Sequence, residues 1–182
     1  TRTAGLLALE RAIDARSEPD RAEGLLLALL ESEATNERAL RMYESLARVP
    51  GRERSLIDAL SRLGALDGGR PSLREAATIA SNIGDRSAAE ALLRRYVDSC
   101  QGGAIDDGDL ASALLSIADL RFQAGDVREA ATFKERAAER LDPPKARPIL
   151  LAVAALAAGP LADNAHAARI YAKLHGDTPG DR

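Results

Sequence analysis

Apolar residues recur at spacings of three and four along most of the chain, and short groups of Gly, Pro, Asp and Asn separate these stretches. This spacing places the apolar residues on one face of a helix, and the separating residues are typical of helix ends and turns. No segment shows the alternating, valine-rich pattern of a strand. We therefore predict an all-helical chain of about ten helices without a sheet.

The clearest unit is a helical hairpin that ends at Pro144. Gly125 and Asp126 separate its two helices: a glycine adopts the left-handed conformation at a helix end, and an aspartate caps the helix that follows. Pro143 and Pro144 are expected to stop the second helix. The apolar positions are Leu110, Leu114, Ile117 and Ala118 in the first helix, and Ala130, Phe133 and Ala137 in the second.

Similar segments occur along the whole chain. "ALRMYESL" and "AARIYAKL" align closely, and each precedes a proline. The leading alanines are Ala8, Ala39, Ala89, Ala130 and Ala167, at intervals of 31, 50, 41 and 37 residues. An irregular repeat of about 35–40 residues is typical of stacked helix pairs. We therefore expect residues 1–182 to form one helical-repeat domain.

The interval of 50 residues contains an additional amphipathic segment, "GRERSLIDALSRLGALDGG". We predict an extra helix at about residues 53–66, because Gly84-Asp85 and Gly125-Asp126 both resemble turns within a pair. The alternative is a shift in the helix-pairing register at this point. The later stretch from Gly102 to Asp109 is expected to be a loop in which Asp109 caps the next helix.

The segment from Ala111 to Pro144 resembles a tetratricopeptide repeat. The matching residues are Gly125, Asp126, Glu129, Ala130, Phe133 and Ala137. Leu114 and Ala118 stand where the family has an aromatic residue and a glycine, and Pro143 lies one residue late. The resemblance implies a right-handed superhelical solenoid of stacked antiparallel helix pairs, whose first helices line a concave groove that binds proteins or peptides.

The same resemblance implies a stripe of partner-binding residues on the first helices of the pairs. This mix of charged, amide and aromatic side chains suits a peptide ligand. The candidates are Arg21 and Glu31, then Arg74, Thr78 and Asn82, then Asp119, Phe122 and Gln123.

The charge pattern gives no indication of nucleic-acid binding. The net charge is −3, and acidic residues are interleaved with basic ones. Of the 25 basic residues only Lys134, Lys145 and Lys173 are lysines. An excess of arginine occurs in RNA-binding proteins and in proteins from GC-rich bacterial genomes. We favour the second explanation, because aromatic residues for base stacking make up only 3% of the chain.

The sequence shows no catalytic, cofactor or metal motif. The stretch from Gly64 to Ser72 has Arg70 and Pro71 where a phosphate-binding loop needs Lys and Ser or Thr. His166 and His175 are nine residues apart, which does not place them on one helix face. Cys100 is the single cysteine and is interpreted as a structural thiol.

Three aromatic residues lie at helical core spacing, and we expect them to be packing residues: Tyr43, Phe133 and Tyr171.

We therefore expect a non-catalytic protein–protein interaction scaffold without cofactors. The alternatives are a self-assembly or regulatory module of a larger bacterial protein, and an enzyme whose site the sequence does not reveal. No apolar run is long enough to cross a membrane and no signal peptide is evident, so we expect a cytoplasmic protein. Both ends are cut at the same phase of the repeat, which favours a fragment of a longer array.

Overall fold

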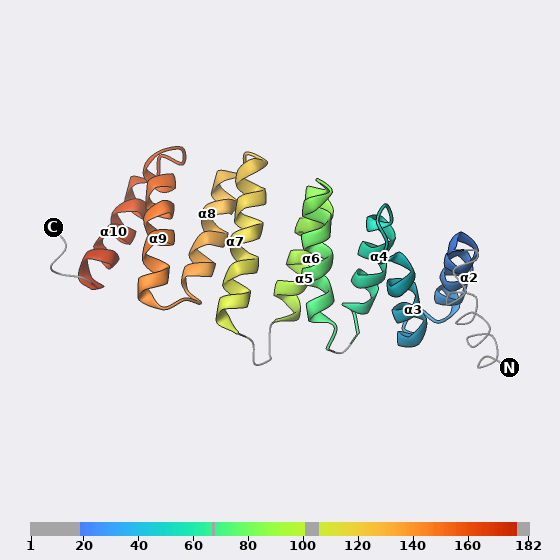
Figure 1. Cartoon of the computed structure of the whole chain (residues 1–182). Coiled ribbons are helices and arrows are strands. Elements are labelled where there is room, and N and C mark those ends of the chain that lie inside the picture. Colours follow the sequence, from blue (N-terminus) through green and yellow to red (C-terminus); the bar gives the residue numbers. More distant parts are fainter. Residues whose placement is uncertain (1–18, 67, 101–105, 178–182) are drawn as a thin grey trace. The chain divides into compact units, whose positions relative to one another are not determined.

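The computed structural model describes residues 19–66, 68–100 and 106–177, and these residues contain nine α-helices and no strand (Figure 1). This confirms the all-helical fold. The first copy of the repeat, with Ala8 as its leading alanine, lies outside the described residues. The helices are α2 (Pro19–Ser32), α3 (Glu37–Ala47), α4 (Glu53–Leu63), α5 (Arg70–Asn82), α6 (Arg86–Ser99), α7 (Asp107–Gln123), α8 (Val127–Ala138), α9 (Pro143–Ala158) and α10 (Asn164–Asp177).

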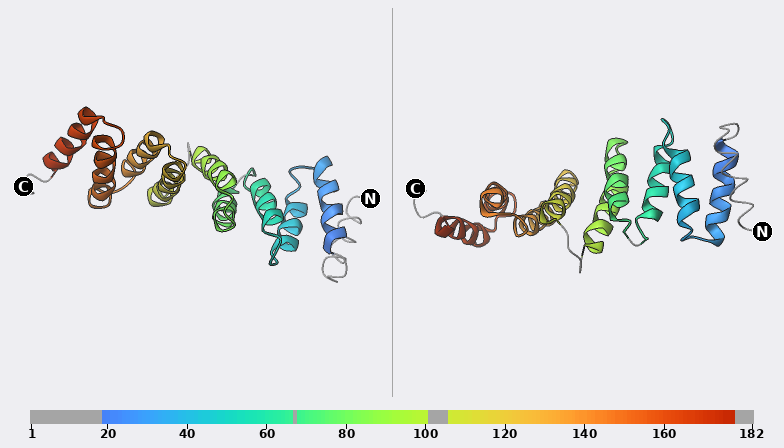
Figure 2. Two further views of the ribbon diagram at one scale, coloured as in Figure 1. Left: turned by 90° about the horizontal axis from the view of Figure 1, so that it is seen from above. Right: turned by 60° about the horizontal axis from the view of Figure 1, so that its bottom comes forward.

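The chain divides into two compact units, residues 1–92 and 93–182, with the boundary inside α6. In the first unit each helix from α2 to α5 contacts the next, and two further views show α2, α3 and α4 side by side (Figure 2). In the second unit α7, α8, α9 and α10 likewise contact one another in sequence. Stacked antiparallel helices therefore form both units, whereas the right-handed superhelix stays a prediction.

Helices alternate between two rows within the first unit. Arg52, at the start of α4, forms an ion pair with Glu23 of α2 at 2.5 Å. Arg48, at the end of α3, forms an ion pair with Glu75 of α5 at 2.7 Å. Since alternate helices are joined in this way, α2 and α4 form one row, and α3 and α5 form the other.

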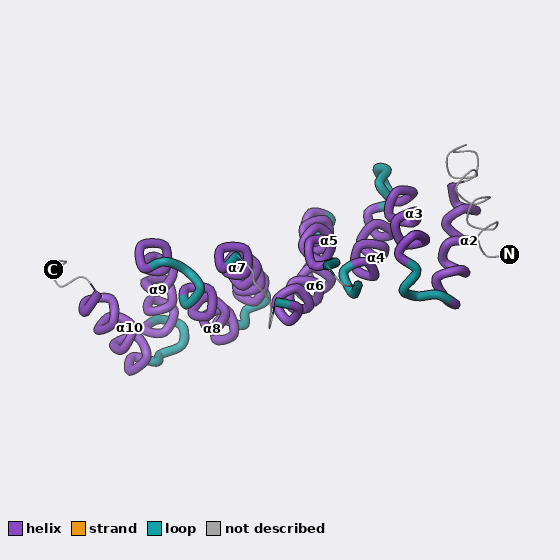
Figure 3. The backbone as a smooth tube through the Cα atoms, turned by 90° about the horizontal axis from the view of Figure 1, so that it is seen from below, coloured by secondary structure: helices purple, strands orange, loops and turns teal. Residues whose placement is uncertain are grey.

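The second unit alternates in the same manner (Figure 3). Arg94 of α6 forms an ion pair with Glu129 of α8 at 2.5 Å. His166 of α10 lies 2.6 Å from Glu135 of α8. Figure 3 shows α8 and α10 in one row and α7 and α9 in the other. In this unit, α9 contacts both α8 and α10.

Thin apolar layers between the rows hold each unit together. In the first unit the layer joins α2, α3 and α4, and in the second unit a layer joins α8, α9 and α10. Alanine is frequent because it lets two helix backbones approach closely. The first layer contains Ala22, Leu26, Leu30, Ala39, Leu40, Tyr43, Ala59 and Leu63. The second contains Ala131, Val153, Ala154, Ile170 and Leu174.

Two Gly-Asp turns join helices as predicted. Gly84 and Gly125 have φ angles of +78° and +86°. In the second turn the Asp126 N–H donates to the Arg121 carbonyl, and the Gly125 N–H donates to the Phe122 carbonyl. Asp85 makes the equivalent bond in the first turn. This pair of bonds ends a helix in the left-handed glycine arrangement.

Asp126 also begins α8, since its carboxylate accepts a hydrogen bond from the Glu129 N–H at 3.1 Å. We expect Asp126→Ala to lower the free energy of unfolding by about 1 kcal/mol, because a helix N-terminal donor loses its partner. Asp126→Asn keeps an acceptor oxygen and should retain most of this stability. Urea unfolding measures both variants. Equal losses would attribute the effect to the charge of Asp126 rather than to the hydrogen bond.

Two predicted helix boundaries are wrong. Asp106, not Asp109, caps α7: its carboxylate accepts from the Gly108 N–H at 2.7 Å, and Asp109 lies inside the first turn. Pro143 and Pro144 begin α9, whereas α8 already ends at Ala138. A proline suits the first helical turn because its fixed φ is helical and no N–H partner is needed there.

The prediction that the three aromatic residues are buried packing residues is correct for two of them. Tyr43 and Phe133 are buried, with 3% and 5% of their surface exposed. Tyr171 is 46% exposed, so its assignment as a packing residue is wrong. On α10 the buried face consists of Ala167, Ile170 and Leu174, and Tyr171 lies beside this face.

Candidate functional site

The residues predicted to bind a partner are mostly at the surface. Arg21, Glu31, Thr78, Asn82, Asp119, Phe122 and Gln123 are exposed, and Arg74 is half-buried. The Thr78 hydroxyl donates to the Arg74 carbonyl at 3.0 Å. Asp119 forms an ion pair with Lys134 at 3.0 Å. The side chain of Phe122 is 50% exposed at the end of α7.

The row structure separates two of these sets. Arg21 and Glu31 lie on α2, whereas Arg74, Thr78 and Asn82 lie on α5. Because α2 shares a row with α4, and α5 shares the other row with α3, these two sets belong to different rows of the first unit. The predicted helix at residues 53–66 is present as α4, and its insertion causes the change of row. The set on α2 and the set on α5 therefore do not lie on one common face.

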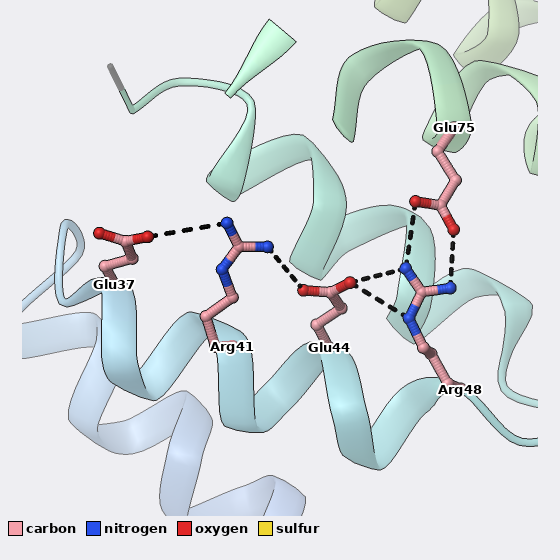
Figure 4. A network of polar contacts seen from close by, with 5 residues as sticks. All are labelled: Glu37, Arg41, Glu44, Arg48 and Glu75. Carbon is pink, nitrogen blue, oxygen red and sulfur yellow. Dashed lines mark hydrogen bonds and ion pairs between the residues drawn. The ribbon is translucent and has the colours of Figure 1, made fainter. Parts of the chain in front are cut away.

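The first unit has a polar depression of about 320 Å³ between α3 and the start of α5. Figure 4 shows the chain of charges beside it, which runs from Glu37 through Arg41, Glu44 and Arg48 to Glu75. Both arginines lie between carboxylates. The depression is therefore lined by three carboxylates and two guanidinium groups that pair with one another, and we assign this network to the contact between α3 and α5.

Arg48 is the centre of this network. Its guanidinium donates to Glu75 through Nη1 at 2.7 Å and Nη2 at 3.1 Å, and to Glu44 through Nη2 at 2.6 Å. Hydrogen bonds to Glu75 and then Glu44 raise the pKa of Arg48, so its charge is permanent. Its side chain remains 45% exposed, and exposed pairs typically contribute about 0.2–1 kcal/mol.

A second polar cluster surrounds Tyr43 in the first unit. Burial is the main cause that raises the pKa of the Tyr43 phenol above 10.0, and the carboxylate of Asp58 adds to it. A hydrogen bond with Ser55 acts in the opposite direction. Ser55 in turn donates to Glu23 at 2.6 Å. The neutral phenol therefore belongs to the packing between α3 and α4.

The raised pKa predicts a loss of stability in alkali. The folded protein binds the phenolic proton more tightly than the unfolded chain, so the contribution of Tyr43 is complete below pH 10.0 and falls as pH rises above it. Urea unfolding between pH 8 and 11.5 should show this fall (roughly the window set by the tyrosine pKa). Tyr43→Phe lacks the ionisable group, and its slope above pH 10.0 should be shallower. Identical slopes would contradict the shift.

A spacious pocket lies in the second unit, between α8 and α10 and over the start of α9. Its volume is about 670 Å³, twice that of the depression beside α3. Its apolar lining comes from three helices and the connection between α8 and α9. The residues are Ala138, Leu141, Pro143, Pro144, Ala146, Leu150, Ile170 and Leu174. We call this the α8–α10 pocket.

Cations predominate among the charged residues of the α8–α10 pocket. Arg147, Arg169 and Lys173 line it together with Glu135 and Glu139, which gives a net charge of +1 with neutral His166. The whole chain has a net charge of −3. The pocket is therefore locally positive on an acidic protein.

His166 fixes the polar edge of this pocket. Its backbone N–H donates to the Asp163 carboxylate at 3.0 Å, which places it in the first turn of α10. Its Nε2 lies 2.6 Å from Glu135, and its Nδ1 lies 3.2 Å from Nη2 of Arg169. Because a guanidinium only donates, Nδ1 accepts and Nε2–H donates to Glu135. The neutral ring thus connects a carboxylate with a cation.

The sequence did not reveal this pocket. Glu135 and His166 are 31 residues apart, and only the pairing of α8 with α10 brings them together. The sequence signal for it was a helix face on which residues recur at spacings of three and four: His166, Arg169, Ile170, Lys173 and Leu174. This face of α10 mixes polar and apolar residues, and the same pattern occurs in helices that lie at the surface without binding anything.

A different surface of α9 is apolar and exposed. Pro148, Leu151, Ala152 and Ala155 are all exposed and lie on one helix face. No charged residue occurs from residue 148 to residue 162. The opposite side of α9 carries the buried core residues, so this helix is apolar nearly all round.

Two other features are absent from the part of the chain that the structure describes. Within the described ranges no group of three or more His, Cys, Asp or Glu is placed to hold a metal ion. No described helix combines the length and the apolar character needed to cross a membrane. Cys100 is a free, buried thiol, in agreement with a structural interpretation.

Comparison with known proteins gave matches among solved structures alone. No family model and no curated protein matches the sequence. A structure described as the crystal structure of MamA is 15% identical, with a TM-score of 0.49, and the match covers 88% of this chain and 89% of that chain. A second structure, described as MamA protein, is 14% identical at the same TM-score of 0.49, covering 96% and 90%. Similarity at this level does not identify a shared function.

Proposed function

We propose that this chain is a non-catalytic scaffold that binds a protein or peptide, and that the α8–α10 pocket is a binding site. The observation that supports this proposal is the combination of an apolar lining with charged residues around it. Protein-binding sites have an apolar centre that excludes water and a polar rim that fixes orientation. A volume of about 670 Å³ accommodates several side chains of a partner.

A capture experiment with matched variants tests this proposal. The immobilised full chain is exposed to a lysate of its source organism, and each captured protein is purified and titrated against the wild type. Leu141→Asp should weaken binding at least tenfold, since it places a charge in the apolar lining. Leu161→Asp is the control, because Leu161 is also half-buried between two helices but does not line the pocket.

Two results would reject the proposal. One is the absence of any protein retained by the full chain above the level of empty beads. The other is equal binding to the wild type and to Leu141→Asp. Circular dichroism of both variants verifies that the helices are retained.

Self-assembly is the second candidate, and the exposed apolar face of α9 favours it. A face without charges lets a second copy approach without repulsion, and small residues such as Ala152 and Ala155 permit close contact. Light scattering at low and high protein concentration distinguishes the two functions. Under self-assembly the mass rises with concentration and Ala155→Glu abolishes the rise, whereas under partner binding alone the mass stays that of a monomer.

A further inference from the structure

We infer that the occupant of the α8–α10 pocket is an acidic peptide segment that carries an apolar anchor side chain. This inference rests on the proposed function and names the chemistry of the partner. The two requirements come from different parts of the pocket: the apolar lining selects the anchor, and the cations beside it select the charge.

The anchor is set by what lines the pocket. Ala138, Leu150 and Ile170 come from α8, α9 and α10, so three helices contribute apolar surface. Ala138 is small, which leaves room beside the larger side chains of the other two. A branched or aromatic side chain inserted here removes apolar surface from water, and this is the main source of affinity in such sites.

The charge preference follows from Arg169 and Lys173, one helical turn apart on α10. Arg169 is held by a neutral histidine, so its positive charge is not cancelled by that contact. Lys173 is exposed and forms no ion pair with the part of the chain that the structure describes. Two cations at a spacing of four lie on the same face of a helix. A carboxylate of the partner reaches both from one side.

The glutamates of the lining do not reverse this preference. Glu135 already accepts a hydrogen bond from His166 at 2.6 Å, which directs its carboxylate toward the ring. Glu135 and the exposed Glu139 together still leave one positive charge in excess from Arg147, Arg169 and Lys173. A basic peptide would meet this excess of positive charge, whereas an acidic peptide gains from it. The polar depression beside α3 has the opposite balance, with three glutamates and two arginines.

A random peptide library displayed on phage, selected on the immobilised full chain, is the probe. We expect the enriched peptides to be negatively charged and to contain Leu, Ile, Phe or Trp. The best peptide is then synthesised and titrated by fluorescence anisotropy. Lys173→Glu should weaken it about tenfold or more, and raising the salt from about 50 to 300 mM should also weaken it. Lys145→Glu is the control, because Lys145 is an exposed cation of α9 outside the pocket.

The outcomes separate this inference from the proposed function. Enriched peptides that are neutral or basic, and that lose affinity with Leu141→Asp, would reject the acidic occupant while the pocket remains a binding site. Acidic peptides that bind Lys173→Glu and Lys145→Glu equally would also reject it, because attraction would then come from elsewhere. If no peptide is enriched and no protein is captured, both proposals fail.

Discussion

Leu114→Ala should lower the free energy of unfolding by about 2–5 kcal/mol, the largest loss that we expect from a single substitution. Leu114 lies in α7 with 2% of its surface exposed, and α7 packs against α8. Truncation removes three carbon atoms from the core and leaves a cavity that neighbouring helices fill incompletely. Small domains have a total stability of about 5–15 kcal/mol, so this loss is substantial.

Leu151→Ala provides the matched control for this substitution. Leu151 is also in the middle of a helix but is 40% exposed, and we expect its loss to remain below about 1 kcal/mol. Hydrogen exchange measures where the loss occurs. Protection of the amide protons should fall first in α7 and α8, because each helix in a stack is stabilised mainly by the helices that it contacts. Equal losses in the two variants would contradict the placement of Leu114 in the core.

Ala130→Leu should destabilise the protein by about 1–3 kcal/mol, because it overpacks the core instead of leaving a cavity. Ala130 has 0% of its surface exposed and lies in the first turn of α8, the helix that packs against α7. A leucine there has no space, so the two helices must separate or adopt strained side-chain conformations. Ala168→Leu is the control at an exposed position of α10. An unchanged melting temperature in Ala130→Leu would mean that α7 and α8 do not approach closely at this position.

Local features of the fold were predictable because a few neighbouring residues determine them. Gly125 and Asp126 form both the end of one helix and the cap of the next, and each role depends on contacts within five residues. The burial of Ala130 and Phe133 followed from helical spacing in the same way. Tyr171 has the same spacing as Tyr43, yet it is exposed, since burial depends on which helix packs against the residue.

The candidate site was not predictable from the sequence because it depends on contacts between distant helices. The predicted stripe assumed that α2 and α5 occupy equivalent positions, and the insertion of α4 places them in different rows. The α8–α10 pocket depends on the 31-residue contact between Glu135 and His166. Helical spacing identifies the faces of each helix, but it does not say which faces of separate helices meet.

The most direct test of the account is an amide chemical-shift titration of the full 15N-labelled chain with a captured partner. We predict that the affected amides cluster on the residues that line the α8–α10 pocket, around Ala138, Leu150 and Ile170. Shifts confined instead to the stripe around Arg74 and Phe122 would contradict the assignment of the binding site to the α8–α10 pocket.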